Sequence, residues 1–162
     1  THIPLAEVAK NIQKSKLIKL IQILHLGLQK KLKIKNPSIT VLGLNPHAGE
    51  NGKIGAEEIK KINPAIKVCK EMGINASYAI SADTAFNVKK LKQTDAYLAM
   101  YHDQALPVLK ALSFGEAVNI TLGAPIVRTS VDHGTAIDIA GKIKPNLGSI
   151  KEAIKAAEIQ LQ

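Results

Sequence analysis

The sequence predicts an α/β fold with a largely parallel sheet. Two observations carry this prediction: apolar residues at helical spacing mark several helices, and short β-branched runs between them mark strands. Helices and strands that alternate along a chain are typical of a parallel sheet with helical crossovers. The composition agrees, because 46% of the 162 residues are hydrophobic and 22% are charged, as in an ordinary globular protein.

The first part of the chain is expected to hold two long helices and three strands. One helix, 15–33, has a single apolar stripe, and Ser15 is a plausible N-cap. In the other, 56–72, Pro64 must kink or restart the helix, and Gly73 ends it. The expected strands are 38–44, 76–80 and 95–101, with a glycine-rich loop at 45–55 and a further helix near 86–91.

The remaining residues continue the alternation. Pro107 begins an expected helix over 106–112, and a fourth strand is expected at 117–122. Residues 126–127 could extend the sheet, 137–140 are expected to form a short helical turn, and 148–161 a terminal amphipathic helix.

The chain carries a formal net charge of +9, with many lysines in its first 35 residues. A basic balance can indicate nucleic acid, an acidic membrane surface or an anionic substrate, although a solvated lysine face is commoner. Nucleic-acid readers usually add arginine and aromatic residues, whereas this chain has one arginine, Arg128, and 3% aromatics. No apolar run is long enough to span a membrane, so neither nucleic acid nor a membrane is an expected partner.

Cys69 is the single cysteine, and it falls in an expected helix, so a structural thiol is its expected role. One cysteine forms no internal disulfide, which fits the cytoplasm, and the start does not have the pattern of a signal peptide. The chain does not begin with methionine, and residues 1–4 read like the middle of a domain, so a fragment is expected.

Two histidines follow expected strands. His47 comes shortly after the first strand, and His102 directly follows the third. Ligands of open α/β sheets bind beyond the carboxyl ends of the strands, so these side chains can converge there. Imidazoles suit zinc and similar ions, and three protein ligands leave a position for substrate. His2 lacks such a context, and spacing alone favours unrelated histidines; His25 is expected to be a surface or packing residue.

Two glycine-rich segments are ambiguous from the residues alone. Residues 45–52 (Asn-Pro-His-Ala-Gly-Glu-Asn-Gly) lack the pattern of a nucleotide P-loop and could be a plain turn cluster. In 132–141, glycines flank a short helix with Asp and His at its start. That geometry can wrap an adenine and ribose, but it is not the Rossmann glycine pattern.

Several segments taken together are far more specific. They are, in chain order, 1–5 (Thr-His-Ile-Pro-Leu), 43–50 (Gly-Leu-Asn-Pro-His-Ala-Gly-Glu), 82–84 (Ala-Asp-Thr), 100–110 (Met-Tyr-His-Asp-Gln-Ala-Leu-Pro-Val-Leu-Lys), 118–123 (Val-Asn-Ile-Thr-Leu-Gly) and 128–136 (Arg-Thr-Ser-Val-Asp-His-Gly-Thr-Ala). With these motifs the chain resembles, over essentially its whole length, the C-terminal part of the 4-hydroxythreonine-4-phosphate dehydrogenases of vitamin B6 biosynthesis.

The resemblance implies a three-layer α/β fold like that of isocitrate and isopropylmalate dehydrogenases, with the N-terminal half absent from this chain. It implies that 1–125 is a metal-binding and dimerisation region, and that 126–162 is an NAD-loop segment with a terminal helix that packs on the missing domain. A homodimer with the active site at its interface is expected.

The resemblance also implies the residues of the site. One divalent metal (Zn, Mg or Co) is expected on His2, His47 and His102, and substrate contacts are expected from Lys110, Asn119 and Arg128. NAD or NADP is expected at the loop residues His133, Gly134, Thr135, Asp138, Gly141 and Asn146.

The implied activity is NAD-dependent oxidation of a small phosphorylated hydroxy-amino acid, 4-phosphohydroxy-L-threonine. The β-keto acid so formed decarboxylates to 3-amino-2-oxopropyl phosphate, and a metal can polarise the hydroxyl and stabilise the enolate. Lys110 and Arg128 can neutralise phosphate or carboxylate. Asp103, Asp83 and Lys110 are the candidate catalytic residues; each Asp could orient a histidine or relay a proton, or could be a cap or turn residue.

Alternatives stay open. Ala105 stands where the family pattern has glycine, which is a local change. A paralogue that oxidises another four-carbon phosphorylated hydroxy acid would carry the same metal and phosphate residues, because specificity lies partly in the absent half. A non-catalytic metal-binding fragment is the alternative from another class, and the isolated chain is expected to be inactive. Three imidazoles suit zinc, cobalt or nickel better than magnesium, but the sequence does not select the metal.

Overall fold

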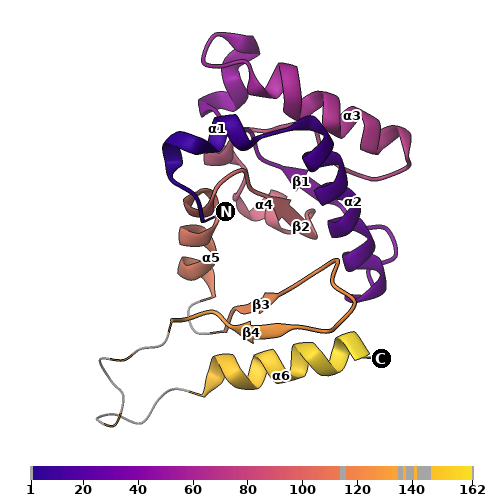
Figure 1. Cartoon of the computed structure of the whole chain (residues 1–162), viewed down its shortest axis with the longest axis vertical. Helices are drawn as coiled ribbons and strands as arrows, with labels where there is room; N and C mark the ends of the chain where they lie inside the picture. Colours follow the sequence, from indigo (N-terminus) through magenta and orange to yellow (C-terminus); the bar gives the residue numbers. More distant parts are fainter. Residues whose placement is uncertain (1, 114–115, 135–136, 138–140, 142–146, 162) are drawn as a thin grey trace. The chain divides into compact units, whose positions relative to one another are not determined.

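The computed structural model describes residues 2–113, 116–134, 137, 141 and 147–161, and it divides into two units, Thr1–Val108 and Leu109–Gln162 (Figure 1). The helices and strands are α1 (Val8–Asn11), α2 (Lys14–Lys30), β1 (Ile39–Val41), α3 (Asn63–Glu71), α4 (Val88–Leu91), β2 (Ala96–Leu98), α5 (Leu106–Leu112), β3 (Val118–Ile120), β4 (Thr129–Val131) and α6 (Gly148–Leu161). Single helical turns lie at Leu5–Glu7, Pro46–Gly52, Glu58–Ile62, Ala82–Thr84 and His102–Gln104.

A parallel pair of strands, β1 and β2, forms the centre of the first unit. Ile39 is paired with Ala96 and Val41 with Leu98, so the two strands end at the same edge. All three residues of β1 are buried, as expected for a strand covered on both faces. The segments that follow the two strands therefore begin side by side, and these segments carry His47 and His102.

The expected strand at 76–80 is only partly present. This segment runs beside β1 and forms isolated parallel bridges at Ala76 and Ile80, but no continuous strand. The reason lies at Ser77, whose side-chain oxygen accepts the Val41 N–H at 3.0 Å, in place of a backbone carbonyl. A side chain that substitutes for the backbone in this way interrupts the ladder.

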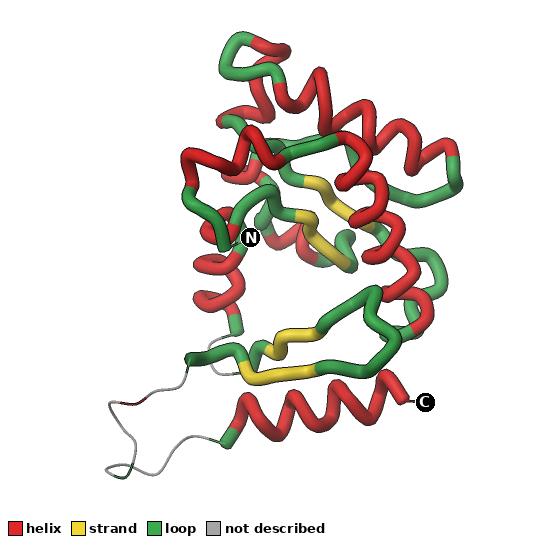
Figure 2. Tube along the Cα trace, in the orientation of Figure 1, coloured by secondary structure: helices red, strands yellow, loops and turns green. Residues whose placement is uncertain are grey.

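Helices α2 and α3 pack against each other beside the strands (Figures 1 and 2). The prediction that Ser15 caps α2 is wrong: Gln13 is the N-cap residue and makes no side-chain capping bond, so Ser15 lies inside the helix. The prediction for Pro64 is confirmed, because a wide turn at Glu58–Ile62 ends there and α3 restarts with Pro64 in its first turn. Gly73, at φ 83°, follows the end of α3.

The core of the first unit is aliphatic. The largest side chains with under 2% exposure include Ile21 of α2, Ile66 of α3 and Ile39 of β1. Cys69 is fully buried in α3, and burial raises the pKa of its thiol, which fits a structural role. His25 is partly buried on α2. Among the described residues, no helix is both long enough and apolar enough to cross a bilayer.

The second unit is an antiparallel ribbon covered by one helix (Figure 2). Strands β3 and β4 pair with Asn119 opposite Ser130, and α6 packs on both. The helix buries the small or polar residues Ser149, Ala153 and Gln160. The prediction that 126–127 extends the sheet is wrong, because the second strand of this ribbon begins at Thr129.

Candidate functional site

His47 lies in a left-handed turn that follows β1. All residues from 47 to 51 have positive φ, between 43° and 80°. Only glycine adopts this region freely, and each other residue costs about 1–2 kcal/mol there. The Ile54 N–H donates to the Gly49 carbonyl at 3.1 Å and closes the turn. Backbone strain of this kind persists only where the surroundings fix the chain, and it clusters at functional sites.

The Glu58 carboxylate fills the inside of this turn. Glu58 is 1% exposed, and it accepts the backbone N–H groups of Leu44 and Asn45, both at 2.8 Å, and the Asn45 side-chain amide at 2.9 Å. A β-carbon at Gly49 would lie 2.6 Å from the Glu58 Oε2. A buried carboxylate is tolerated where N–H donors satisfy its oxygens. Glu58 therefore fixes the loop that presents His47.

His47 and Asp83 share a recess of about 330 Å³. Its wall is formed by residues 44–47 and 81–83, together with Tyr101 and Gln104. The Ser81 hydroxyl donates to the Asp83 carboxylate and is the main cause of a lowered Asp83 pKa; the charge of His47 acts in the same direction. The structure thus brings one candidate catalytic carboxylate close to one predicted metal ligand.

His102 begins the turn after β2 and lies between a carboxylate and a second imidazole. Its Nδ1 is 2.6 Å from Asp103 Oδ1, and the His2 ring centroid lies 5.0 Å from its own, at an interplanar angle of 62°. When Nδ1–H donates to Asp103, Nε2 carries the lone pair. Metal-bound histidines commonly donate their other ring N–H to a carboxylate in this way.

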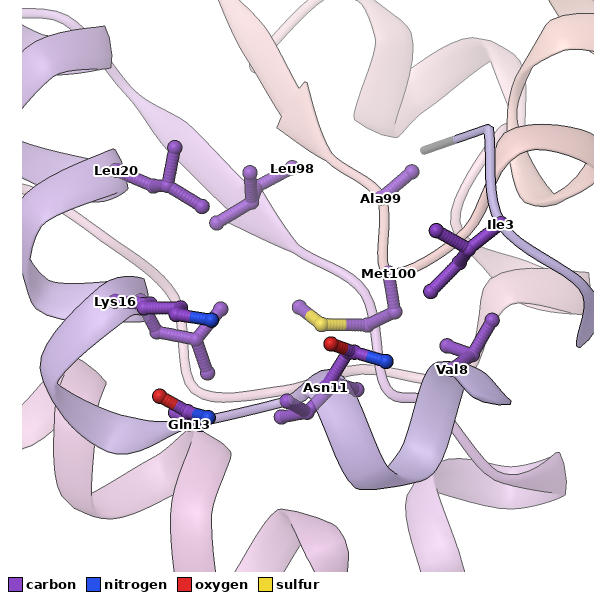
Figure 3. A pocket seen from close by; sticks show the side chains of 11 residues that line it. Ile3, Val8, Asn11, Gln13, Lys16, Leu20, Leu98, Ala99 and Met100 are labelled. Atoms are coloured by element: carbon purple, nitrogen blue, oxygen red, sulfur yellow. The ribbon is translucent and has the colours of Figure 1, made fainter. Parts of the chain in front are cut away.

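An apolar recess of about 200 Å³ lies against the segments that carry His2 and His102. Ile3 follows His2, Met100 precedes His102 by two residues, and both side chains line this recess (Figure 3). Side chains of α1 and α2, among them Asn11 and Lys16, form another part of the wall. Packing of Ile3 near Met100 thus supports the contact between the two imidazole rings.

The three predicted metal ligands are not gathered in one cluster. Within residues 2–113, 116–134, 137, 141 and 147–161, no group of three or more His, Cys, Asp or Glu side chains could hold a metal ion. His2 and His102 are adjacent, whereas His47 faces a recess with Asp83. The imidazole donor set and the Asp103 contact fit a divalent ion in chemical terms. That all three rings bind one ion stays a prediction.

In the second unit, Lys110 is held by Asp132. The Lys110 ammonium donates to Asp132 Oδ2 at 2.7 Å and to the Asp132 backbone carbonyl at 2.6 Å, and the Ser149 hydroxyl donates to Oδ1 at 3.1 Å. The hydrogen bond from Lys110 is the main cause of a lowered Asp132 pKa. A cation fixed in this way presents its charge at a defined position.

The other predicted substrate residues belong to the β3–β4 ribbon. Asn119 is exposed on β3, and Arg128 is exposed just before β4, where its guanidinium donates to the Thr121 hydroxyl at 3.1 Å. The second unit therefore carries Lys110, Asn119 and Arg128, and the first unit carries all three predicted metal ligands.

The predicted cofactor loop is described only in part. His133 and Gly134 are exposed, with the His133 Nδ1 3.0 Å from the Gly134 carbonyl, and Gly141 has φ 72°. Thr135, Asp138 and Asn146 lie outside the described residues. The role of this loop stays a prediction.

Sequence reasoning missed two buried polar residues at the site, Glu58 and Gln104, which are 1% and 8% exposed. Glutamate in an expected helix, and glutamine between an expected strand and an expected helix, are usually solvated. Nothing in their spacing marked them; their importance follows from the backbone groups that they contact.

Parallel strands followed by histidines, with carboxylates beside the rings, define an α/β protein with a candidate metal site at its strand ends. A family model agrees with this class and is more specific. The chain belongs to the family of the pyridoxal phosphate biosynthetic protein PdxA, whose model matches residues 1–157.

Two curated relatives are both described as 4-hydroxythreonine-4-phosphate dehydrogenases. The chain is 55% identical over 158 residues to the 4-hydroxythreonine-4-phosphate dehydrogenase of Chromobacterium violaceum, covering 98% of this chain and 48% of that protein. It is 53% identical to the protein of the same description from Pseudoalteromonas translucida, covering 100% of this chain and 50% of that protein. The chain thus spans about half the length of the curated relatives it matches.

Solved structures confirm the predicted fold class. The crystal structure of 4-hydroxythreonine-4-phosphate dehydrogenase from Klebsiella pneumoniae matches with a TM-score of 0.86 at 36% identity, covering 99% of this chain and 49% of that chain. A terephthalate 1,2-cis-dihydrodiol dehydrogenase from Burkholderia xenovorans matches with a TM-score of 0.76 at 26% identity, covering 98% and 50%. This α/β dehydrogenase fold thus occurs with different substrates.

Proposed function

We propose that the chain is the metal-binding part of an NAD-dependent 4-hydroxythreonine-4-phosphate dehydrogenase. Its reaction oxidises the secondary alcohol of 4-phosphohydroxy-L-threonine by hydride transfer to NAD or NADP. The resulting β-keto acid loses carbon dioxide and leaves 3-amino-2-oxopropyl phosphate. The family membership and the descriptions of the half-matched relatives support the proposal.

One geometric observation carries the proposal. His102, at the end of β2, has the Asp103 carboxylate on its Nδ1 and the His2 ring beside it. An imidazole with its Nδ1 hydrogen-bonded to a carboxylate and a second imidazole nearby is a common beginning of a divalent metal site. We assign His2, His47 and His102 as its ligands.

His2, His47 and His102 would hold the ion, and a divalent ion bound there would supply Lewis acidity toward the substrate hydroxyl. Zinc, cobalt or nickel suits the nitrogen donors better than magnesium. Asp103 orients the His102 ring. Asp83, kept ionised by Ser81 and His47, is the candidate acceptor for a proton at the His47 recess.

The second unit supplies the cationic and neutral donors for an anionic substrate. The Lys110 ammonium and the Arg128 guanidinium neutralise phosphate or carboxylate, and Asn119 adds a neutral donor. The proposal includes a homodimer with the site at its interface, a cofactor loop at His133–Gly141, and a cytoplasmic location.

The alternative is a paralogue that oxidises another four-carbon phosphorylated hydroxy acid with the same predicted metal and phosphate residues. The fold itself does not select the substrate, because the Burkholderia xenovorans protein with this fold is named for a different one. Turnover of 4-phosphohydroxythreonine and of 4-phosphoerythronate should therefore be compared, by NAD reduction, with the chain joined to the N-terminal half of the Chromobacterium violaceum relative. Faster turnover of 4-phosphohydroxythreonine supports the proposal, and preference for 4-phosphoerythronate would favour the paralogue.

The metal assignment is tested by His47→Ala. The variant should lose one of three nitrogen ligands, so tight zinc or cobalt binding should disappear, as measured by equilibrium dialysis with elemental analysis. His25→Ala is the control, because His25 lies on α2 and is not an assigned ligand. Unchanged metal content in His47→Ala would refute the assignment.

A further inference from the structure

Gln104 joins the two segments that carry His47 and His102. Its Oε1 accepts the Met100 N–H at 2.7 Å, and its Nε2 donates to the Gly43 carbonyl at 2.5 Å. Gly43 follows β1 and Met100 follows β2, so one side chain bridges the ends of both strands. His47 follows Gly43 by four residues, and Gln104 itself follows His102 by two residues.

A primary amide suits this position. The bridge needs one group that accepts a backbone N–H and donates to a backbone carbonyl at the same time, and the amide of Gln or Asn offers both. Gln104 is 8% exposed, so each of these bonds is shielded from water. A buried donor or acceptor left without its partner costs about 1–3 kcal/mol, which makes the bridge difficult to open.

Further hydrogen bonds fix the segments that carry His47 and His102. Glu58 holds the His47 loop through the Leu44 and Asn45 N–H groups, which directly follow Gly43. On the other strand, Asp103 holds the His102 ring and precedes Gln104. A shift at the Gly43–Gln104 contact would therefore move two otherwise rigid segments relative to each other.

We propose that Gln104 is a positioning residue that sets the relative placement of the His47 and His102 ligands. The proposal rests on the metal site proposed above. Gln104 is not one of the assigned ligands; it bonds to the two backbone segments that carry His47 and His102. Partners of metal ligands in an outer shell typically contribute about 10–100-fold to metal affinity.

The test is Gln104→Met in the full chain, titrated with cobalt(II). Methionine keeps the length and apolar volume of glutamine but makes neither backbone bond. Cobalt affinity should fall about 10–100-fold, and the visible absorption of the bound cobalt should change, because that spectrum reports the geometry of the ligands. Should Gln104→Met fail to fold, Gln104→Glu, which keeps an acceptor for the Met100 N–H, takes its place.

Thr40→Val is the matched control. The Thr40 hydroxyl, in the middle of β1, is 2.8 Å from the hydroxyl of Thr94, which precedes β2, so this contact also links the two strand segments but involves neither segment that carries a histidine. Its loss should lower the free energy of unfolding without altering cobalt affinity or spectrum. A purely structural role for Gln104 would make the two variants behave alike.

The possible outcomes separate the two proposals. The Gln104 variant could keep the cobalt affinity and spectrum of the unsubstituted chain while His47→Ala loses cobalt binding. That result would overturn the role of Gln104 alone. Cobalt binding that is absent from the unsubstituted chain, or indifferent to His47→Ala, would overturn the metal site and with it the inference. Weaker binding and an altered spectrum in Gln104→Met, but not in Thr40→Val, would support both.

Discussion

The left-handed turn at 47–51 places a ligand candidate on strained backbone. Four of its five residues are not glycine, so the strain sums to several times the cost of about 1–2 kcal/mol for each. The buried Glu58 carboxylate offsets this cost through its hydrogen bonds to Leu44 and Asn45. His47 is therefore presented by a rigid loop, and the position of its ring depends on Glu58.

Gly49→Ala tests this account at a single residue. Alanine at φ 80° is strained, and its β-carbon would also lie 2.6 Å from Glu58 Oε2. We expect a loss of about 2–4 kcal/mol in the free energy of unfolding, measured in urea. Gly73→Ala is the control, since Gly73 has φ 83° but no atom near its β-carbon position, and it should lose only about 1 kcal/mol. Equal losses at both positions would show that Glu58 does not restrict the turn.

At the residue scale, the sequence indicated chemistry but not conformation. The placement of His47 and His102 after strands followed from the alternation of β-branched and helical segments, and the structure shows both there. The left-handed turn could not be predicted, because Ala and Glu, two of its five residues, rarely adopt positive φ. Glu58 and Gln104 were missed because their value comes from backbone groups brought close only by the fold.

At the scale of elements, long periodic helices and three of the four strands were predictable, because the expected strands 38–44, 95–101 and 117–122 contain β1, β2 and β3. Helix α2 and the terminal α6 lie where their apolar spacing placed them. The strand β4 (Thr129–Val131) was missed: it begins two residues after the predicted 126–127 segment and pairs antiparallel with β3. The strand expected at 76–80 was only partly found. The Ser77 side chain accepts the Val41 N–H there, and this single hydrogen bond interrupts the strand beside β1.

Asp132 connects three elements of the second unit, because it follows β4 and bonds to Lys110 of α5 and Ser149 of α6. Its folded-state pKa is lowered, so its contribution to stability is present above the unfolded value of about 3.9 and is lost as the pH falls through the folded value. We expect Asp132→Asn to lose about 1 kcal/mol at pH 7, a modest value because Lys110 is partly exposed.

The measurement for Asp132→Asn is urea unfolding across a pH series. The difference in free energy of unfolding between the original chain and the variant should be constant from neutral pH down to about pH 4 and should shrink below it. Asp95→Asn is a comparison from the first unit, where the carboxylate accepts the Ser38 N–H. A difference for Asp132→Asn that grew as the pH fell would contradict the ion pair with Lys110.

At the scale of the whole molecule, the two kinds of candidate site residue are divided between two units. The predicted metal ligands belong to Thr1–Val108, and Lys110, Asn119 and Arg128 to Leu109–Gln162. The chain also spans about half the length of its curated relatives. An enzyme must hold its reacting groups in one geometry, since misplacement by about 1 Å can cost about 100-fold in rate.

We therefore expect the 162-residue chain to bind metal without turning over substrate. Because His2, His47 and His102 all lie within it, we expect the chain alone to bind cobalt. We expect no NAD reduction with 4-phosphohydroxythreonine, because these residues correspond to about half the length of the relatives named for that activity. The chain joined to the N-terminal half of the Chromobacterium violaceum relative is the positive control for turnover. Turnover by the chain alone at the rate of this control would contradict the prediction. It would show that these 162 residues are sufficient for catalysis.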